Sequence, residues 1–367
     1  MAEASDHAVV IGAGIAGLLA ARALEGRFGQ VTVVDRDALP DQPVPRVGVP
    51  QARHTHRTLG RGRRALEELF PGLTDALVAR GAVPGRLGVS RPLLEWYVRQ
   101  RLTSSPQVRF LERTAALDLR WDPAGGRVVG VRAVNCDDPS TTPLATTIEA
   151  DLVVDASGRA SRLTEWLHRA GHAEPRQQLV RVDLTYVTRQ FRWSSVDLGC
   201  PPQLVVTPRP GIAGAATAMR QENGVWTVSV AGYHGNRPPL ELERFLAAAS
   251  LYGGSHLAGM LNHAEPLDDG TSYRFPANRR WHYEGTAVPP GVLAVGDAVC
   301  TLDPLLGHGM TLSALEALNL GAHGLGRPTA AFFRRTARLL AGPWSVAVQQ
   351  ARRTEPGPSW SAATGSD

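Results

Sequence analysis

The chain has 367 residues, 43% of them hydrophobic and 20% charged, a composition typical of a soluble globular protein with ample material for a buried core. Its formal net charge is +5, and all 39 basic residues are arginine. The absence of lysine excludes a Schiff base, a P-loop and any other catalytic lysine. Because the arginines are dispersed, apart from Arg61, Arg63 and Arg64, we expect no nucleic-acid surface; an anionic cofactor or acidic substrate explains the charge.

The cysteines and the N-terminus bear on the cellular compartment. Cys136, Cys200 and Cys300 are far apart and lack CxxC spacing, so they predict neither a disulfide framework nor a zinc site and fit a reducing cytoplasm. The apolar run near the N-terminus follows acidic Glu3 and Asp6 and is interrupted by glycines, unlike a signal peptide. No other segment approaches the ~20 apolar residues of a membrane span. We therefore expect a cytoplasmic protein without a membrane span.

The N-terminal stretch has the pattern of a strand, a turn, a helix and a second strand. The β-branched run 9–11 predicts the first strand, and the apolar run 15–24 predicts the helix. The run 31–34 predicts the second strand, which ends on Asp35.

Three glycines between the first strand and the helix complete a GxGxxG pattern. Gly12 permits a tight turn, Gly14 lets a pyrophosphate approach the backbone, and Gly17 lets helix and strand pack closely. The free N–H groups of the first helical turn favour an anion. Asp35, 18 residues after Gly17, is placed to bind a ribose and would repel a 2′-phosphate. The pattern therefore predicts FAD or NAD rather than NADP.

Residues 37–155 alternate between helical and strand patterns. The proline-rich stretch 37–50 predicts a loop, and residues 122–126 predict a hairpin turn. The expected helices are one through Leu66 and Leu69, one over 73–80 and one over 91–102, and the expected strands lie over 108–112, 117–121, 127–134 and 148–155.

The composition then changes to long strands with one amphipathic helix over 240–250. This block predicts a largely antiparallel sheet inserted between two halves of the first domain. The expected strands cover 181–193, 204–207, 215–220, 225–232 and 273–279.

An α/β pattern returns at 291–297 and is followed by helices over 311–325 and 332–350. We therefore predict an α/β fold: a Rossmann-like dinucleotide-binding domain (1–178 and 288–353), an inserted antiparallel-sheet substrate domain (179–287), C-terminal helices and a disordered tail (354–367).

Three stretches far apart in sequence each follow a predicted strand. They are the glycine fingerprint, the run from Asp155 to Gly158, and the run from Gly296 and Asp297 into the glycine-rich loop 303–310. Because an open α/β sheet binds its ligand at the carboxyl ends of its strands, we expect the three to converge there.

In this order the three stretches resemble the single-component FAD monooxygenases of the para-hydroxybenzoate hydroxylase type. The runs 46–51 and 91–95, with His54 and His56, are most similar to the bacterial epoxidase and hydroxylase branch that acts on polyketides and terpenoids. The resemblance spans about residues 7–350.

The resemblance implies an FAD-binding Rossmann-like domain and a role for each matched residue. The glycines hold the pyrophosphate, Asp35 and Arg36 lie at the adenosine, and Asp297 binds the ribityl chain. Asp155 and Gly158 shape the second sheet contact. Arg46 and Arg91 approach the phosphates or the ribityl, and 307–310 cover the isoalloxazine. The implied FAD-binding residues are Gly12, Gly14, Ile15, Ala16, Gly17, Asp35, Arg36, Arg46, Arg91, Asp155, Gly158, Asp297, Pro304, Gly307, Gly309 and Met310.

Several side chains allow more than one interpretation. His308, where relatives usually have glutamine, is the candidate catalytic residue, or it belongs to the loop structure. His54 and His56 are catalytic, or they are structural and line the flavin; no neighbouring ligand suggests a metal. The aromatic side chains Trp193, Trp226 and Tyr233 face an apolar substrate or form plain core. Arg279 and Arg280 bind an acidic tail or form a solvated face, and Cys300 is expected to be buried.

The expected activity is epoxidation or hydroxylation through a flavin hydroperoxide, with dioxygen and a small apolar polyketide- or terpenoid-like substrate as partners. With one dinucleotide fold, NAD(P)H binds transiently or a separate flavin reductase supplies electrons. A flavin halogenase is disfavoured because similar enzymes need a lysine. A non-redox cyclase or isomerase on the same fold is the main alternative, and a pure scaffold is a lesser one.

Overall fold

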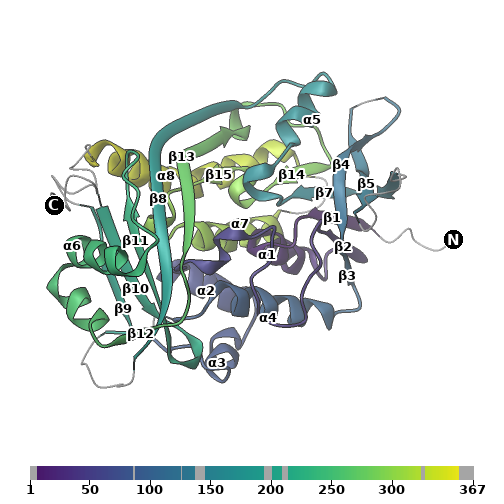
Figure 1. Ribbon diagram of the computed structural model, residues 1–367. Coiled ribbons are helices and arrows are strands. Elements are labelled where there is room, and N and C mark those ends of the chain that lie inside the picture. The colour runs from purple at the N-terminus through teal and green to yellow at the C-terminus, as the bar shows by residue number, and fades with distance from the viewer. Residues whose placement is uncertain are drawn as a thin grey trace.

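The computed structural model describes residues 6–85, 87–124, 126–136, 145–193, 201–208, 214–323 and 327–354. Figure 1 shows two main sheets side by side, with the N-terminal elements on the right and the long strands on the left. The predicted mixed α/β fold, with a parallel sheet and a separate antiparallel sheet, is confirmed.

The first sheet is parallel and has the strand order β14-β7-β1-β2-β3. Its central strand β1 is buried along almost its whole length, as expected for a strand covered on both faces. The strands are β1 (His7–Ile11), β2 (Gln30–Val34), β3 (Val108–Leu111), β7 (Leu152–Asp155) and β14 (Val292–Ala294).

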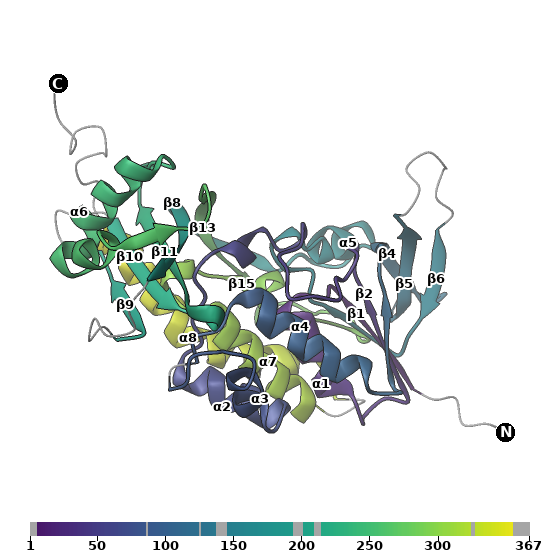
Figure 2. The same cartoon turned by 60° about the horizontal axis from the view of Figure 1, so that its bottom comes forward.

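Helices cover one face of this sheet, as Figure 2 shows for α1, α4 and α7. A three-stranded antiparallel sheet lies on the other side and contacts β7 and β2. The elements are α1 (Ile15–Leu24), α4 (Arg91–Thr103), α7 (Gly309–Ala322), β4 (Thr114–Trp121), β5 (Val128–Asn135) and β6 (Thr146–Glu149).

The strand predicted over 148–155 is wrong in one respect, because the chain forms two strands there. β6 pairs with β5 in the small antiparallel sheet, whereas β7 pairs with β1 and β14 in the parallel sheet. At the break, the Asp151 N–H donates to the His7 carbonyl and the His7 N–H donates to the Asp151 carboxylate. A continuous run of strand-forming residues does not reveal such a change of partner.

The second sheet has the order β15-β13-β8-β11-β10-β9, with β12 paired to β8, and the neighbouring strands are antiparallel. The sheet extends beyond the predicted insertion, because β15 follows β14 in the chain. The strands are β8 (Arg176–Trp193), β9 (Gln203–Val206), β10 (Gly214–Arg220), β11 (Val225–Gly232), β12 (Ala264–Pro266), β13 (Thr271–His282) and β15 (Cys300–Thr301). The exact domain boundaries remain a prediction.

Helix α6 (Leu242–Leu261) packs on one face of this sheet and forms a second hydrophobic core. Trp193 and Trp226 lie in this core with ring centroids 4.8 Å apart, and the Trp193 indole N–H donates to the Met260 carbonyl at 2.6 Å. Tyr233 is also buried. The plain-core interpretation of these three aromatic side chains is therefore the correct one.

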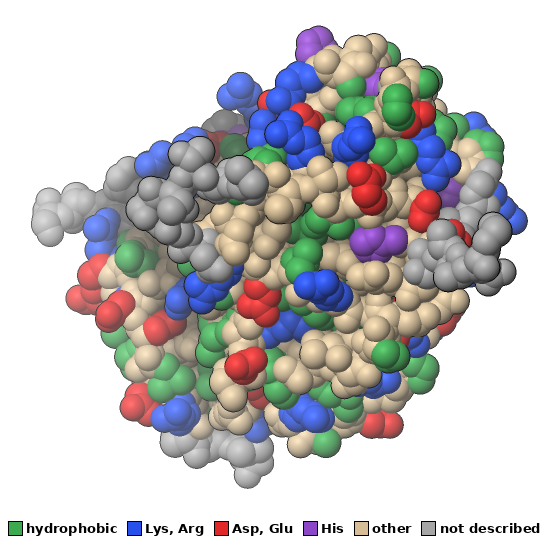
Figure 3. All heavy atoms as spheres, turned by 90° about the vertical axis from the view of Figure 1, so that its right-hand side faces the viewer, with side chains coloured by type: hydrophobic (Ala, Val, Ile, Leu, Met, Phe, Trp, Pro, Cys, Tyr) green, Lys and Arg blue, Asp and Glu red, His purple; other side chains and the backbone are tan. Residues whose placement is uncertain are grey.

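The remaining helices are α2 (Gly60–Leu69), α3 (Leu73–Val78), α5 (Leu163–Arg169) and α8 (Thr329–Arg353). Within the described ranges, none of the helices combines the length and the apolar character that crossing a membrane requires. The tail predicted to be disordered lies outside the described residues beyond Thr354. On the face in Figure 3, arginines and carboxylates are interspersed rather than gathered into one continuous patch.

Candidate cofactor and substrate site

One cavity of about 360 Å³ lies at the carboxyl ends of the parallel strands. It joins the three stretches that were expected to converge: the glycine turn after β1, the loop after β7, and the segments after β14. Of the predicted FAD-binding residues, Gly12, Gly14, Ile15, Ala16, Asp35, Arg36, Arg46, Arg91, Gly158, Asp297, Pro304, Gly307, Gly309 and Met310 line it.

The three glycines of the fingerprint have different physical roles. Gly12 has φ +101°, and a Cβ there would lie 2.7 Å from the Ala156 carbonyl oxygen. A Cβ on Gly17 would lie 1.7 Å from the Gly12 carbonyl oxygen, whereas one on Gly14 would meet nothing within 4 Å. Gly12 and Gly17 are therefore required by the protein itself, and only Gly14 leaves space that a ligand could use. Gly17 does not line the cavity, and its place among the cofactor-binding residues stays a prediction.

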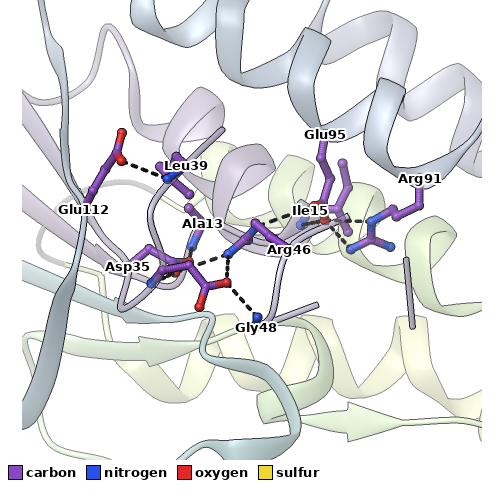
Figure 4. Close-up of polar contacts among 10 residues, drawn as sticks. Ala13, Ile15, Asp35, Leu39, Arg46, Gly48, Arg91, Glu95 and Glu112 are labelled. Carbon is purple, nitrogen blue, oxygen red and sulfur yellow. Dashed lines mark hydrogen bonds and ion pairs between the residues drawn. The ribbon is translucent and has the colours of Figure 1, made fainter. Parts of the chain in front are cut away.

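A network of carboxylates and arginines surrounds one end of the cavity (Figure 4). Asp35 accepts hydrogen bonds from the Ala13 N–H at 2.6 Å and the Asp37 N–H at 2.9 Å. Arg46 reaches Asp35 at 3.2 Å and Asp37 at 2.9 Å. Burial lowers the pKa of Arg46, and the nearby carboxylates raise it by more, so its guanidinium stays charged.

Glu95 links the two arginines that line the cavity. It is 5% exposed and accepts hydrogen bonds from Arg91 at 2.6 Å and from the Ile15 N–H at 3.0 Å. It also forms an ion pair with Arg46 at 3.9 Å. The sequence analysis did not assign Glu95 a role, although its i,i+4 spacing from Arg91 is a typical ion-pair signal. Glu95 itself does not line the cavity, so it positions Arg46 and Arg91.

Asp155 lies beneath the cavity rather than in its wall. It is fully buried and accepts hydrogen bonds from the Ser157 N–H at 2.9 Å and from the Ser157 and Ser161 hydroxyls, each at 2.5 Å. Burial raises the pKa of its carboxyl, and these hydrogen bonds lower it by less. Asp155 therefore shapes the loop that carries Gly158, and a direct contact with a cofactor stays a prediction.

Asp297 lines the cavity together with Arg159. Burial raises the pKa of Asp297, while Arg159, Arg91 and Arg279 lower it by less. Arg279 donates to the Arg159 carbonyl, and Arg280 is 8% exposed and pairs with Glu284 at 2.7 Å. Arg280 therefore belongs to a buried ion pair, and the expectation of a solvated face is wrong for it. Cys300 is buried, as expected.

The loop before α7 is held in place by Asp303. Its carboxylate accepts hydrogen bonds from the Tyr233 hydroxyl at 2.6 Å and from the Leu305 N–H at 2.9 Å. Gly307 is left-handed at φ +68°, and a Cβ there would lie 2.8 Å from the Arg57 guanidinium. The loop therefore presents bare backbone to the cavity.

His308, the candidate catalytic residue, does not line the cavity. It is half-buried at the residue before α7, which begins at Gly309, and its side chain caps no helical N–H. Burial lowers the pKa of His308, and Arg57 lowers it further. This placement favours the loop-structure interpretation, and a catalytic role for His308 stays a prediction.

Of the two other histidines, His56 lines the cavity and His54 is buried behind it. His56 lines the cavity, and its Nδ1–H donates to the His54 carbonyl at 2.9 Å, which leaves Nε2 as an acceptor. Burial, followed by Arg91, lowers the pKa of His56 to about 3. His54 is 2% exposed, and burial, followed by Arg53, lowers its pKa to about 4. Both imidazoles are therefore neutral at pH 7.

The second sheet supplies an aromatic wall that the sequence analysis missed. Tyr186, Tyr273 and Phe275 line the cavity, and the Arg159 guanidinium lies 5.3 Å from the Phe275 ring centre. The β8–β13 register places Tyr186 directly opposite Tyr273. The alternating strand pattern could have suggested these residues, but only the register shows that they share a face with the cavity.

No group of three or more His, Cys, Asp or Glu side chains within the described ranges has the arrangement of a metal site. No family model matches the chain. Protein Rv3254 of Mycobacterium tuberculosis (strain ATCC 25618 / H37Rv) is 33% identical over 350 residues, which cover 86% of this chain and 72% of that protein. The chain belongs to the family of Protein Rv3254.

Solved structures show that its fold is one that flavin-dependent monooxygenases and halogenases share. PqsL, "a probable FAD-dependent monooxygenase from Pseudomonas aeruginosa", matches with a TM-score of 0.71 at 15% identity, over 95% of this chain and 96% of PqsL. OxyS anhydrotetracycline hydroxylase from Streptomyces rimosus matches with a TM-score of 0.64 at 18% identity, over 96% of this chain and 70% of OxyS. At these identities the likeness concerns the fold.

Proposed function

We propose that the chain is an FAD-dependent monooxygenase. The observation that carries the proposal is a single cavity that joins the glycine turn around Gly14 to the loop around Gly307 at the carboxyl ends of parallel strands. A dinucleotide with a second ring system at its far end has the extended shape that such a cavity fits. The fold likeness to PqsL and OxyS supports the same assignment.

The residues present fit FAD. The open space over Gly14 and the α1 N-terminus suit a pyrophosphate, with Arg46 and Arg91 as its counter-charges. Asp35 suits a ribose hydroxyl, and Asp297 suits the ribityl hydroxyls. Bound FAD would supply the activation and transfer of oxygen, chemistry that no amino-acid side chain provides.

The protein side chains bind the cofactor and substrate and exclude water, and they do not react themselves. The aromatic side chains of β8 and β13 exclude water from the far end of the cavity, and neutral His56 offers an acceptor at Nε2. We propose a small, largely apolar natural-product intermediate as substrate, supported by this aromatic wall. The electrons come from NAD(P)H or from a separate flavin reductase, and the lack of lysine argues against halogenation.

The assignment is tested by the colour and the oxygen consumption of the purified protein. A yellow protein that bleaches with NADH or NADPH and consumes oxygen in air supports it. A yellow protein that is inert to both nicotinamides, and also to flavin-reductase-supplied electrons, favours the non-redox cyclase or isomerase. A colourless protein that FAD cannot reconstitute contradicts cofactor binding.

A Gly14→Val variant locates the pyrophosphate. Because a Cβ at this position would meet nothing within 4 Å, the variant should fold and yet lose FAD retention by at least tenfold. Gly60→Val is the control: Gly60 is the first residue of α2, and a Cβ there would likewise meet nothing within 4 Å. Because Gly60 lies outside the cavity, FAD retention should be unchanged. Wild-type retention in Gly14→Val would refute the placement.

A further inference from the structure

A small second cavity opens beside the first, and we call it the niche. It measures about 20 Å³, which is room for one water-sized group. It shares Thr55, Arg57 and Tyr186 with the main cavity, as well as the backbone of the loop before α7. Its deeper wall comes from the second sheet, through Gln203, Thr217 and Ser229. It therefore lies between the loop and the sheet.

A chain of hydrogen bonds runs from the buried imidazole of His54 into the niche. His54 Nδ1 lies 2.7 Å from the Thr188 hydroxyl, which lies 2.6 Å from the Ser229 hydroxyl. Ser229 in turn lies 3.2 Å from the Thr55 hydroxyl, and Thr55 lies 3.0 Å from the Thr217 hydroxyl. Every link joins groups that can either donate or accept, so the direction of the chain is set at its buried end.

The environment of His54 Nε2 sets that direction. This atom is buried and has no hydrogen-bond partner among the described residues, and the neutral ring carries a single proton. The Thr188 hydroxyl can accept a hydrogen bond from Nδ1–H, whereas none of the described residues accepts one at Nε2, so we assign the proton to Nδ1. Nδ1–H then donates to Thr188, and each hydroxyl donates to the next. The last hydroxyl, Thr217, has no further acceptor among the described residues, so its hydrogen can point into the niche.

A second donor faces the same space. The Gln203 side chain lines the niche, and its Nε2 is buried without a partner among the described residues. None of the described lining residues is acidic, and one, Arg57, is cationic. The lining therefore offers hydrogen-bond donors and positive charge, the complement of an oxygen that accepts hydrogen bonds.

We propose that the niche binds one acceptor oxygen of the substrate, a carbonyl or an ionised phenol, through Thr217 and Gln203. The inference rests on the proposed function, because it identifies the polar end of the substrate of the same site. The substrate class is then an aromatic or polycyclic ketone or phenol rather than a pure hydrocarbon. Thr188 acts as a positioning residue, because it orients the hydroxyls without lining the niche.

The test compares two probes that differ in one oxygen, 1-tetralone and its parent tetralin. Calorimetry measures their binding to the FAD-loaded protein, and we expect a preference of about tenfold for the ketone, the scale of one or two neutral hydrogen bonds. In Thr217→Val and Gln203→Leu the preference should fall below about threefold. 4-Nitrophenol is the phenolate probe: its yellow ionised form should be enriched on binding to the wild type and not to these variants.

Two further variants separate chemistry from structure. Thr185→Val makes the same substitution on β8, beside Tyr186 and therefore on the opposite face of the sheet, and it should keep the wild-type preference. Thr188→Val breaks the hydrogen-bond chain outside the niche and should reduce the preference as Thr217→Val does. Loss of preference only in the variants that line the niche would refute the assigned direction of the chain.

Equal affinity of the wild type for ketone and hydrocarbon, including no detectable binding of either, would overturn the proposal, as would a preference that survives in Thr217→Val and Gln203→Leu. FAD retention is measured first on the same samples. If the protein binds no FAD, the proposed function fails, and the same calorimetry on the cofactor-free protein still decides whether the niche prefers the ketone.

Discussion

Glu316 on α7 is a carboxyl group enclosed behind the cavity wall. It is 1% exposed, and one of its oxygens accepts a hydrogen bond from the Gly296 N–H, next to Asp297, at 2.6 Å. Its other oxygen has no partner among the described residues. Burial therefore raises the pKa of Glu316 to about 8, with a smaller contribution from Asp297. The group is mostly protonated at pH 7.

This carboxyl predicts a specific pH dependence of stability. Because its pKa is higher in the folded than in the unfolded state, its contribution is fully present below about pH 4.5 and is lost as pH rises through about 8. Between pH 6 and 8 the wild type should lose up to about 1.4 kcal/mol per pH unit relative to Glu316→Gln, which keeps the acceptor oxygen and cannot ionise. Urea unfolding at pH 6, 7 and 8 measures the free energy of unfolding of both proteins. If the free energy changes equally with pH in the two, the assignment is contradicted.

At the scale of elements, α1 is fixed to the first sheet by a contact that only glycine allows. A Cβ on Gly17 would lie 1.7 Å from the carbonyl oxygen of Gly12, a backbone atom that cannot move without opening the turn. The helix and the strand thus approach each other more closely than any larger residue permits. This packing directs the first-turn N–H groups of α1 to the cavity. The close contact of Gly17 with Gly12 therefore determines both the helix–strand packing and the shape of the site.

Gly17→Ala should therefore destabilise the fold by at least about 1–3 kcal/mol, the range for overpacked sites, even though alanine favours helices. Gly60→Ala, at the open start of α2, should change stability by less than about 1 kcal/mol. Denaturant unfolding of both variants compares the two effects. A Gly17→Ala protein as stable as the wild type would show that the turn relaxes freely.

The sequence was a good guide to elements with strong local signals. The GxGxxG turn, the three convergent loops and the antiparallel character of 176–282 all follow from glycine spacing and residue alternation. It was a poor guide where pairing partners decide the outcome, as at the break between β6 and β7 and in the joining of Tyr186 to Tyr273. His308 shows a third limit of sequence reasoning. It directly precedes α7, and a shift of the helix start by one residue would turn its side chain in another direction, which the sequence does not specify.

At the scale of the whole molecule, the cavity lies where the parallel sheet and its loops meet the second sheet, so a ligand there contacts residues of both sheets. Such a ligand stabilises the folded state by mass action. At a hundredfold excess over its dissociation constant, FAD should add about 2.7 kcal/mol to the free energy of unfolding.

Thermal and urea unfolding with and without FAD measure this gain, which should be absent in Gly14→Val. NADP⁺ at the same concentration is the control for nucleotide charge, because Asp35 and Asp37 would repel its 2′-phosphate. A gain with NADP⁺ equal to that with FAD would show that the cavity does not discriminate at its adenosine end.

The place of β15 has a practical consequence for protein engineering. Cys300 and Thr301 close the edge of the second sheet against Arg280 and Arg279, yet they follow Asp297 by only a few residues of chain. A chimaera that imports the long strands of a relative and rejoins this chain ahead of residue 297 would graft a foreign β13 onto a native edge strand. Crossover points for recombination between relatives are therefore better chosen beyond residue 302, so that the edge strand travels with its sheet.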